Sequence, residues 1–138
     1  MTKFIIHSDG GARGNPGPSA IGVVLASPKG ETVATISEYI GETTNNQAEY
    51  RAVIAGLGKA KELGATEVEC VLDSELVVKQ LNREYKVKHP DLKPVFEKAR
   101  MLALGFSKVL FRHVRREENK AADALVNEAL DKESGDAV

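Results

Sequence analysis

Four acidic residues lie in or beside segments of this chain that are otherwise apolar. Asp9 and Asp73 each end an apolar segment with the composition of a β-strand, Glu49 shares the inward face of an expected helix, and Asp123 lies beside an apolar helical stripe. Burying a lone carboxylate is costly, so proteins pair it, hydrogen-bond it or let it neutralise. Four carboxylates brought to one place would repel one another unless divalent cations held them. The four acids therefore predict a fold that gathers distant segments around a metal site.

The kind of metal follows from the kind of ligand. Open α/β sheets place their ligand sites at the carboxyl ends of strands, which is where Asp9 and Asp73 are expected. A helix N-terminus stabilises a carboxylate such as Glu49 by only about 0.3 to 1 kcal/mol, whereas burying an ion costs several. The helix alone therefore does not account for Glu49. Carboxylate oxygens suit Mg²⁺ or Mn²⁺, and neither cysteine nor histidine occurs at zinc-like spacing. We expect Mg²⁺, with Mn²⁺ as a possible substitute.

The hydrophobic pattern predicts five strands and four helices. We expect strands over residues 3–9, 21–26, 32–40, 67–73 and 108–114, and helices from Thr44 to about Gly64 and over residues 90–104 and 117–130. Ser74 can cap a further short helix that carries Leu76, Val77 and Leu81. Thr44 and Gln47 have the spacing of a capping box, and Gly64 is a typical helix stop. The glycine-rich residues 10–18 predict a tight connection between strands. Three strands followed by strands that alternate with helices indicate an α/β fold with a mixed sheet and an antiparallel edge.

Length and composition indicate one globular domain. The chain has 138 residues, of which 42% are hydrophobic and 28% charged, as in ordinary folded proteins. We expect residues 1–130 to form the domain and residues 131–138 to be a frayed tail. No segment resembles a membrane span or a signal peptide, so we expect a cytoplasmic protein without a membrane partner, and a monomer. The net charge is -1, so a nucleic-acid partner would have to be held by local basic groups or metal ions.

Simpler explanations compete with each of these features. A single Asp after a strand is more often a turn or cap residue than a ligand, and Asp123 alone could be a solvated helix acid. The glycine-rich segment lacks the spacing of a nucleotide-binding loop and precedes a strand rather than a helix. Arg115 and Arg116 could be a solvated patch, or could contact phosphate near Asp123. The metal-site hypothesis rests on the coincidence of all four acids.

Four sequence motifs together resemble type 1 ribonuclease H. They are Ser8-Asp9-Gly10-Gly11 with Gly14-Asn15-Pro16-Gly17-Pro18, Thr43-Thr44-Asn45-Asn46-Gln47-Ala48-Glu49, Asp73-Ser74, and Glu118-Asn119-Lys120-Ala121-Ala122-Asp123. The resemblance covers nearly the whole chain in the family's order, and the combination is far more specific than any single motif. It implies a three-layer ribonuclease H-like fold, with a five-stranded sheet of order 3-2-1-4-5, strand 2 antiparallel, flanked by helices.

The resemblance also implies an activity and a set of site residues. It implies endonucleolytic hydrolysis of the RNA strand of RNA/DNA hybrids, which leaves 5′-phosphate and 3′-hydroxyl ends. Asp9 would bridge two Mg²⁺ ions, Glu49 and Asp73 would complete one metal site, and Asp123 would help to hold the other.

Substrate contacts are implied as well. Asn15, Asn45 and Asn46 would contact the minor groove of the hybrid, where amides can both donate to and accept from base edges and 2′-hydroxyls. Thr44 would bind a phosphate of the DNA strand. Near the fourth acid, Arg115 and Arg116 are further candidates for phosphate contact.

The chain departs from the family pattern in three places. Many members have a glutamine two residues after the third acid, where this chain has Glu75, and an acid cannot donate to a base edge. The chain also lacks the histidine-bearing loop before the last acid, and only the basic residues 83–89 remain of the basic protrusion of longer members. We therefore expect altered hybrid selectivity, slower turnover or a different release step, and weaker binding.

Three other functions remain open from the sequence. The chain could be a module that binds hybrids without cleaving them, although the presence of all four acids argues against this. It could be a broader nuclease that also cuts double-stranded RNA or RNA–DNA junctions, which Glu75 leaves open. It could also be a structural domain with incidental acids, which would leave the inward position of Glu49 unexplained.

Overall fold

A computed structural model of the chain, which describes residues 2–135, contains one five-stranded mixed sheet of order β3-β2-β1-β4-β5. The strands are β1 (Lys3–Ala12), β2 (Gly17–Ala26), β3 (Thr32–Thr43), β4 (Glu67–Leu72) and β5 (Lys108–His113). β2 runs antiparallel to β1 and β3, while β1, β4 and β5 are parallel. The predicted strand order and mixed sheet are confirmed.

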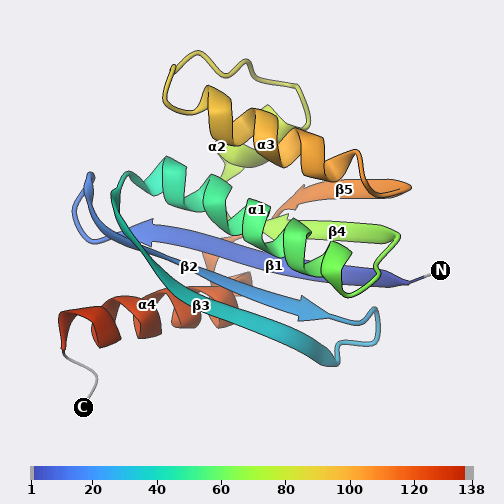
Figure 1. Ribbon diagram of the computed structural model, residues 1–138, viewed down its shortest axis with the longest axis horizontal. Coiled ribbons are helices and arrows are strands. Elements are labelled where there is room, and N and C mark those ends of the chain that lie inside the picture. The colour runs from blue at the N-terminus through green and yellow to red at the C-terminus, as the bar shows by residue number, and fades with distance from the viewer. Residues whose placement is uncertain (1, 136–138) are drawn as a thin grey trace.

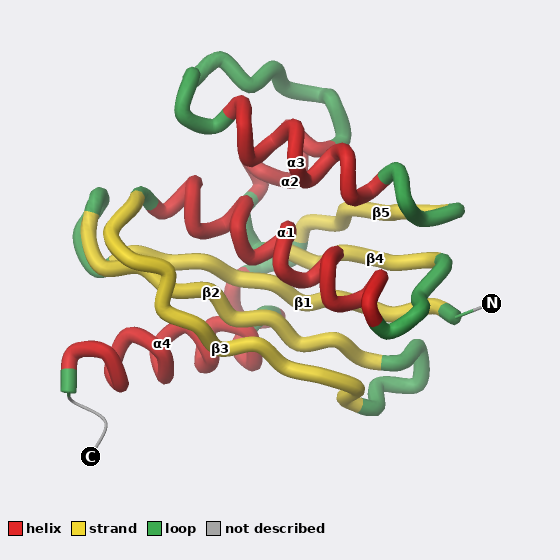
Figure 2. Tube along the Cα trace, viewed as in Figure 1, coloured by secondary structure: helices red, strands yellow, loops and turns green. Residues whose placement is uncertain are grey.

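Helices cover both faces of the sheet and make a three-layer structure (Figures 1 and 2). Helices α1 (Asn45–Glu62), α2 (Glu75–Leu81) and α3 (Lys93–Ala103) lie on one face, and α4 (Lys120–Ser134) lies on the other. The larger core cluster lies beneath the first three helices, and a smaller one around Val126 and Leu130 lies beneath α4. None of the helices among residues 2–135 is long and apolar enough to cross a membrane.

Helix α1 begins and ends close to the predicted positions. The Thr44 hydroxyl accepts a hydrogen bond from the Gln47 backbone N–H, which satisfies one of the free donors of the first turn. The Gln47 side chain donates to the Asp91 carbonyl rather than back to Thr44, so only half of the predicted capping box forms. Gly64 has a φ of +85° just after the helix, as expected for a helix stop.

The glycine-rich residues 10–18 do form a tight connection between strands, but most of them belong to the strands themselves. β1 continues to Ala12 and β2 begins at Gly17, so only residues 13–16 connect them. Gly10 explains why glycine occurs inside a strand. A Cβ there would lie 2.2 Å from the Ala48 carbonyl carbon, so the β1 backbone packs directly on α1.

The end of the chain also differs from the prediction. A 3₁₀ turn (Arg116–Glu118) precedes α4, which runs to Ser134 rather than ending at residue 130. Residues 131–134 are therefore helical and not part of a frayed tail, while residues 136–138 lie outside the described residues. Gly135, with a φ of +81°, adopts the left-handed conformation that ends the helix. The third helix is shorter than predicted and starts at Lys93, after residues 90–92.

Two glycines of α1 give a matched test of this packing. Gly56→Ala would place a Cβ 2.7 Å from Ile6 Cγ2 and 3.2 Å from Val23 Cγ1, so we expect a loss of roughly 1 to 3 kcal/mol from overpacking. Gly58→Ala has no neighbouring atom within 4 Å and should stabilise the helix by about 0.5 to 1 kcal/mol. Denaturant unfolding of both variants measures the difference. Equal effects of the two substitutions would contradict the close approach of α1 to the sheet.

Candidate active site

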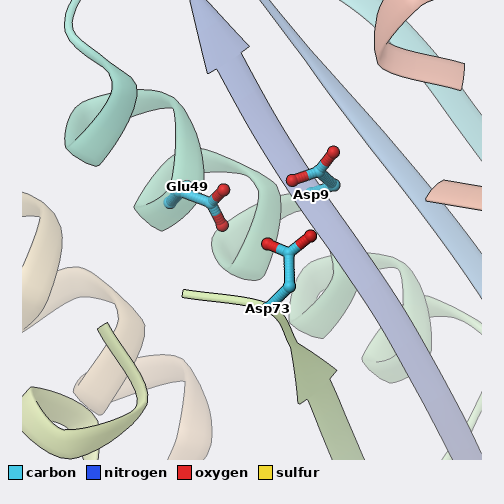
Figure 3. A group of neighbouring side chains, drawn as sticks. All are labelled: Asp9, Glu49 and Asp73. Atoms are coloured by element: carbon cyan, nitrogen blue, oxygen red, sulfur yellow. The ribbon is translucent and has the colours of Figure 1, made fainter. Parts of the chain in front are cut away.

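Three of the four acids meet at one edge of the sheet. Asp9 lies on β1, Glu49 on α1 and Asp73 directly after β4, and carboxylate oxygens of the three lie within 4.8 Å of one another. Figure 3 shows the three side chains pointing toward one another. The register explains two of them: His7 on β1 pairs with Val71 on β4, so two residues further along Asp9 and Asp73 come side by side on the same face.

The close contact between β1 and α1 brings Glu49 to the same place. Because Gly10 has no side chain, the strand backbone lies against residues 48 and 49, and the Gly10 N–H donates a hydrogen bond to the Glu49 carboxylate. Glu49 is only 8% exposed. Its Oε2 atom is buried and accepts no hydrogen bond from the described residues. A buried carboxylate oxygen without a donor fits a cation ligand.

The pKa of each of the three acids is raised above its usual value. Burial is the main cause for each of them. It raises the pKa of Asp9 to about 7, with a further contribution from the charge of Asp73. It also raises the pKa of Glu49 well above its usual value, where the charge of Asp9 contributes next. The pKa of Asp73 is raised too, while a hydrogen bond from Asn119 opposes the shift. A divalent cation would relieve this repulsion and hold all three carboxylates ionised.

Asp123 joins the cavity but lies outside the group of three. All four acids line a cavity of about 440 Å³. The side chain of Asp123 hydrogen-bonds with Asp9, and its Oδ1 lies 3.7 Å from Arg116 Nη2. The Asp123 side chain is also more exposed, at 30%. The structure therefore gathers three of the predicted acids, Asp9 and Glu49 buried and Asp73 half-buried, with Asp123 at the rim of the cavity.

Comparisons with known proteins show the family to which the chain belongs. A family model described as "Reverse transcriptase-like" matches residues 7–129. A ribonuclease HI of Halobacterium salinarum is 49% identical over 125 residues, which cover 91% of this chain and 63% of the relative. The crystal structure of RNase H1 from that archaeon matches with a TM-score of 0.92 at 46% identity, covering 94% of this chain and 98% of that one. The chain belongs to the type 1 ribonuclease H family.

Two further relatives define how far the similarity extends. LC11-RNase H1, isolated from compost and solved in complex with an RNA/DNA hybrid, matches with a TM-score of 0.91 at 48% identity, covering 95% of this chain and 99% of that one. A bifunctional protein of Mycobacterium tuberculosis is 47% identical over 130 residues, which cover 94% of this chain. This chain spans only 36% of the length of that mycobacterial relative.

The predicted substrate residues of this chain lie in separate places. Asn45 lines the acidic cavity with Arg116, whereas Arg115 is exposed and is not among the residues that line it. Asn15, Thr44 and Asn46 line a neighbouring cavity. Two hydrogen bonds of these asparagines join the β1–β2 connection to the start of α1. The Asn45 N–H donates to Asn15 Oδ1 (3.0 Å), and Asn45 Oδ1 accepts from the Ala12 N–H (2.8 Å).

Asn119 is a site residue that the sequence did not single out. It is 1% exposed, and its Nδ2 donates to the Ser8 carbonyl (2.9 Å), next to Asp9. It also hydrogen-bonds with Asp73, so it links β1 to the end of β4. A polar residue before a helix is usually interpreted as a cap, yet the Asn119 side chain caps nothing in α4. Its position in the Glu118–Asp123 motif was the one sequence feature that could have indicated a role at the site.

The raised carboxyl pKa values predict how stability depends on pH without metal. Acids whose folded pKa is raised stabilise the fold most below their unfolded pKa, and this stability is lost as pH rises through the folded value. With the pKa of Asp9 at about 7, we expect the metal-free protein to lose roughly 1 to 3 kcal/mol between pH 5 and pH 8. Thermal melts of the wild type and Asp9→Asn across this range measure the effect.

The Asp9→Asn variant should lose much less stability over the same range, and Mg²⁺ should restore the wild type at pH 8. If the wild type and the variant lost stability equally over this pH range, the pKa of Asp9 would not be raised in the folded protein.

Proposed function

We propose that this ribonuclease H hydrolyses the RNA strand of RNA/DNA hybrids endonucleolytically and leaves 5′-phosphate and 3′-hydroxyl ends. The convergence of the Asp9, Glu49 and Asp73 carboxylate oxygens within 4.8 Å carries the proposal. The complex of LC11-RNase H1, a relative of 48% identity, with an RNA/DNA hybrid supports the choice of substrate.

The donor set fits two Mg²⁺ ions, for which Mn²⁺ could substitute. All four side chains offer hard oxygen ligands, and the unpartnered Glu49 Oε2 is a ready ligand atom. Asp9, Glu49 and Asp73 would hold one ion, and Asp9 and Asp123 the other. When bound, paired divalent ions activate a water nucleophile and stabilise the leaving oxygen of an in-line displacement.

The protein contributes the positions of these ligands. β1 and β4 fix Asp9 and Asp73 through their shared register, and Asn119 ties both strand ends together. Ligands that are held before substrate arrives require little rearrangement during reaction. Asn15, Thr44, Asn45 and Asn46 are proposed to bind the hybrid, with Arg116 at the rim near Asp123.

A nuclease of broader specificity is the second candidate, and Glu75 favours it. Glu75 lies in the first turn of α2, and its carboxylate pairs with Lys79 Nζ at 3.1 Å. This carboxylate offers no proton to a base edge, in contrast to the glutamine of many family members. Selection for deoxyribose-containing duplexes is therefore expected to be weaker, so that double-stranded RNA or RNA–DNA junctions could also be cut.

Loss of a single metal-ligand carboxylate tests the main proposal. We expect Asp9→Asn, Glu49→Gln or Asp73→Asn to lower hybrid cleavage by about 1,000-fold or more, because each removes a charged ligand. Circular dichroism checks that the fold is kept. Lys29→Ala, in the turn at the opposite end of the sheet, is the control and should cleave normally. Near-normal cleavage by the acid variants would refute the proposal, and hybrid binding without cleavage by the wild type would indicate a non-catalytic module.

A substrate panel tests the role of Glu75. We expect Glu75→Gln to raise kcat/KM for hybrid relative to double-stranded RNA by roughly 3- to 10-fold, because an amide can donate as well as accept. Glu84→Gln, which neutralises an exposed acid beyond α2, controls for the loss of charge. The ratio of rates on hybrid, duplex RNA and junction substrates is measured with Mg²⁺ and with Mn²⁺. An unchanged ratio would exclude Glu75 from substrate selection.

A further inference from the structure

Arg13 occupies a fixed position in the turn between β1 and β2. Its backbone N–H donates to the Pro18 carbonyl at 2.8 Å, which closes the turn. Gly17 packs against the same residue, since a Cβ there would lie 2.3 Å from the Arg13 carbonyl oxygen. The turn therefore presents the Arg13 side chain from a tightly packed backbone.

The Arg13 side chain lines the acidic cavity and is held at its edge by α4. Its Nη2 donates to Asp131 Oδ1 at 2.5 Å, and both side chains are 42% exposed. Among the described residues, two arginines, Arg13 and Arg116, line this cavity with the four acids. Arg116 lies near Asp123, so each guanidinium is paired with a single carboxylate of α4.

The turn that carries Arg13 lies between two cavities. Arg13 and Asn45 line the acidic cavity, while Asn15 and Thr44 line its neighbour. Two hydrogen bonds through Asn45, one from Ala12 and one to Asn15, fasten the turn to the start of α1. A long polyanion that reaches both cavities must pass over this turn, where Arg13 is the basic residue on the acidic side.

We propose that Arg13 binds a phosphate of the RNA strand beside the acidic cavity, and that Asp131 holds the guanidinium in place until the hybrid displaces it. The inference rests on the proposed function, because it takes an RNA/DNA hybrid as the ligand.

An exposed ion pair contributes little net stability, so its carboxylate is readily exchanged. A phosphate can accept two parallel hydrogen bonds from the planar guanidinium. The positive charge of Arg13 would also offset the repulsion between the phosphate and the nearby carboxylates.

The competing explanation is that the Arg13–Asp131 pair only fastens the turn to α4. The two explanations make opposite predictions for the loss of Asp131. If the ion pair only held the turn against α4, Arg13→Ala and Asp131→Ala would weaken hybrid binding equally. Phosphate binding by Arg13 would make Arg13→Ala harmful and Asp131→Ala neutral or favourable, because the second change frees the guanidinium.

Hybrid affinity separates these cases. Kd for a labelled RNA/DNA hybrid is measured by fluorescence anisotropy in the Glu49→Gln background, so that the strand stays intact. We expect Arg13→Ala to raise Kd by about 5- to 10-fold and to lower the slope of log Kd against log salt by about one, as for one lost phosphate contact. Arg13→Lys should recover part of the loss.

Asp131→Ala should lower Kd by roughly two- to threefold, and this gain should disappear in the Arg13→Ala/Asp131→Ala double variant. Two controls match the charge changes. Lys29→Ala removes a positive charge at the far end of the sheet, and Glu133→Ala removes a negative charge near Asp131 on the same helix. Both should stay within about twofold of the background.

The inference is overturned if Asp131→Ala weakens binding as much as Arg13→Ala, or if Arg13→Ala resembles Lys29→Ala. Cleavage by the otherwise unchanged chain is assayed separately. A chain that binds hybrid through Arg13 without cleaving it would refute the proposed activity and leave this inference standing. A chain that cleaves hybrid with no dependence on Arg13 would support the proposed activity and refute this inference. The absence of any hybrid binding would overturn both the proposed activity and this inference.

Discussion

Repulsion among the carboxylates of Asp9 and Glu49, which are buried, and Asp73, which is half-buried, is the constraint around which the rest of the site is arranged. The sheet and α1 hold these groups close together. Burial, and after it the charge of Asp73, raises the pKa of Asp9 to about 7. The cohesion of the surrounding core keeps them there. A divalent cation would convert the same repulsion into binding affinity, because the carboxylates are already assembled when it arrives.

The distribution of charge around the cavity follows from this centre. Four carboxylates face inward, while Arg13 and Arg116 lie among the lining residues and are paired with acids of α4. A chain of net charge -1 has no general attraction for a polyanion, so affinity must come from a few local groups. The cavity lined by Asn15, Thr44 and Asn46 adds neutral donors and acceptors beside the charged one.

The sequence predicted the main features because they depend on periodicity and on strand ends. Asp9 and Asp73 follow apolar strands, and Glu49 falls four residues before a buried valine, so their convergence could be expected from the order of residues alone. The strand ends within residues 10–18 were not predicted because glycine usually marks turns. Gly10 instead lies inside a strand, where the lack of a side chain lets the strand backbone contact α1. The end of α4 was placed too early because Gly135, which stops it, lies beyond the last apolar residue of the stripe. Asn119 was missed because its burial depends on contacts with Ser8, more than a hundred residues away.

The contact between Gly10 and α1 has a consequence for how such a protein can vary. The spacing between the strand that carries Asp9 and the helix that carries Glu49 is set by main-chain atoms touching main-chain atoms. Substitutions elsewhere in the core can therefore lower stability without changing the distance between these two carboxylates. Accumulated substitutions would lower thermal stability before they altered the spacing of Asp9 and Glu49.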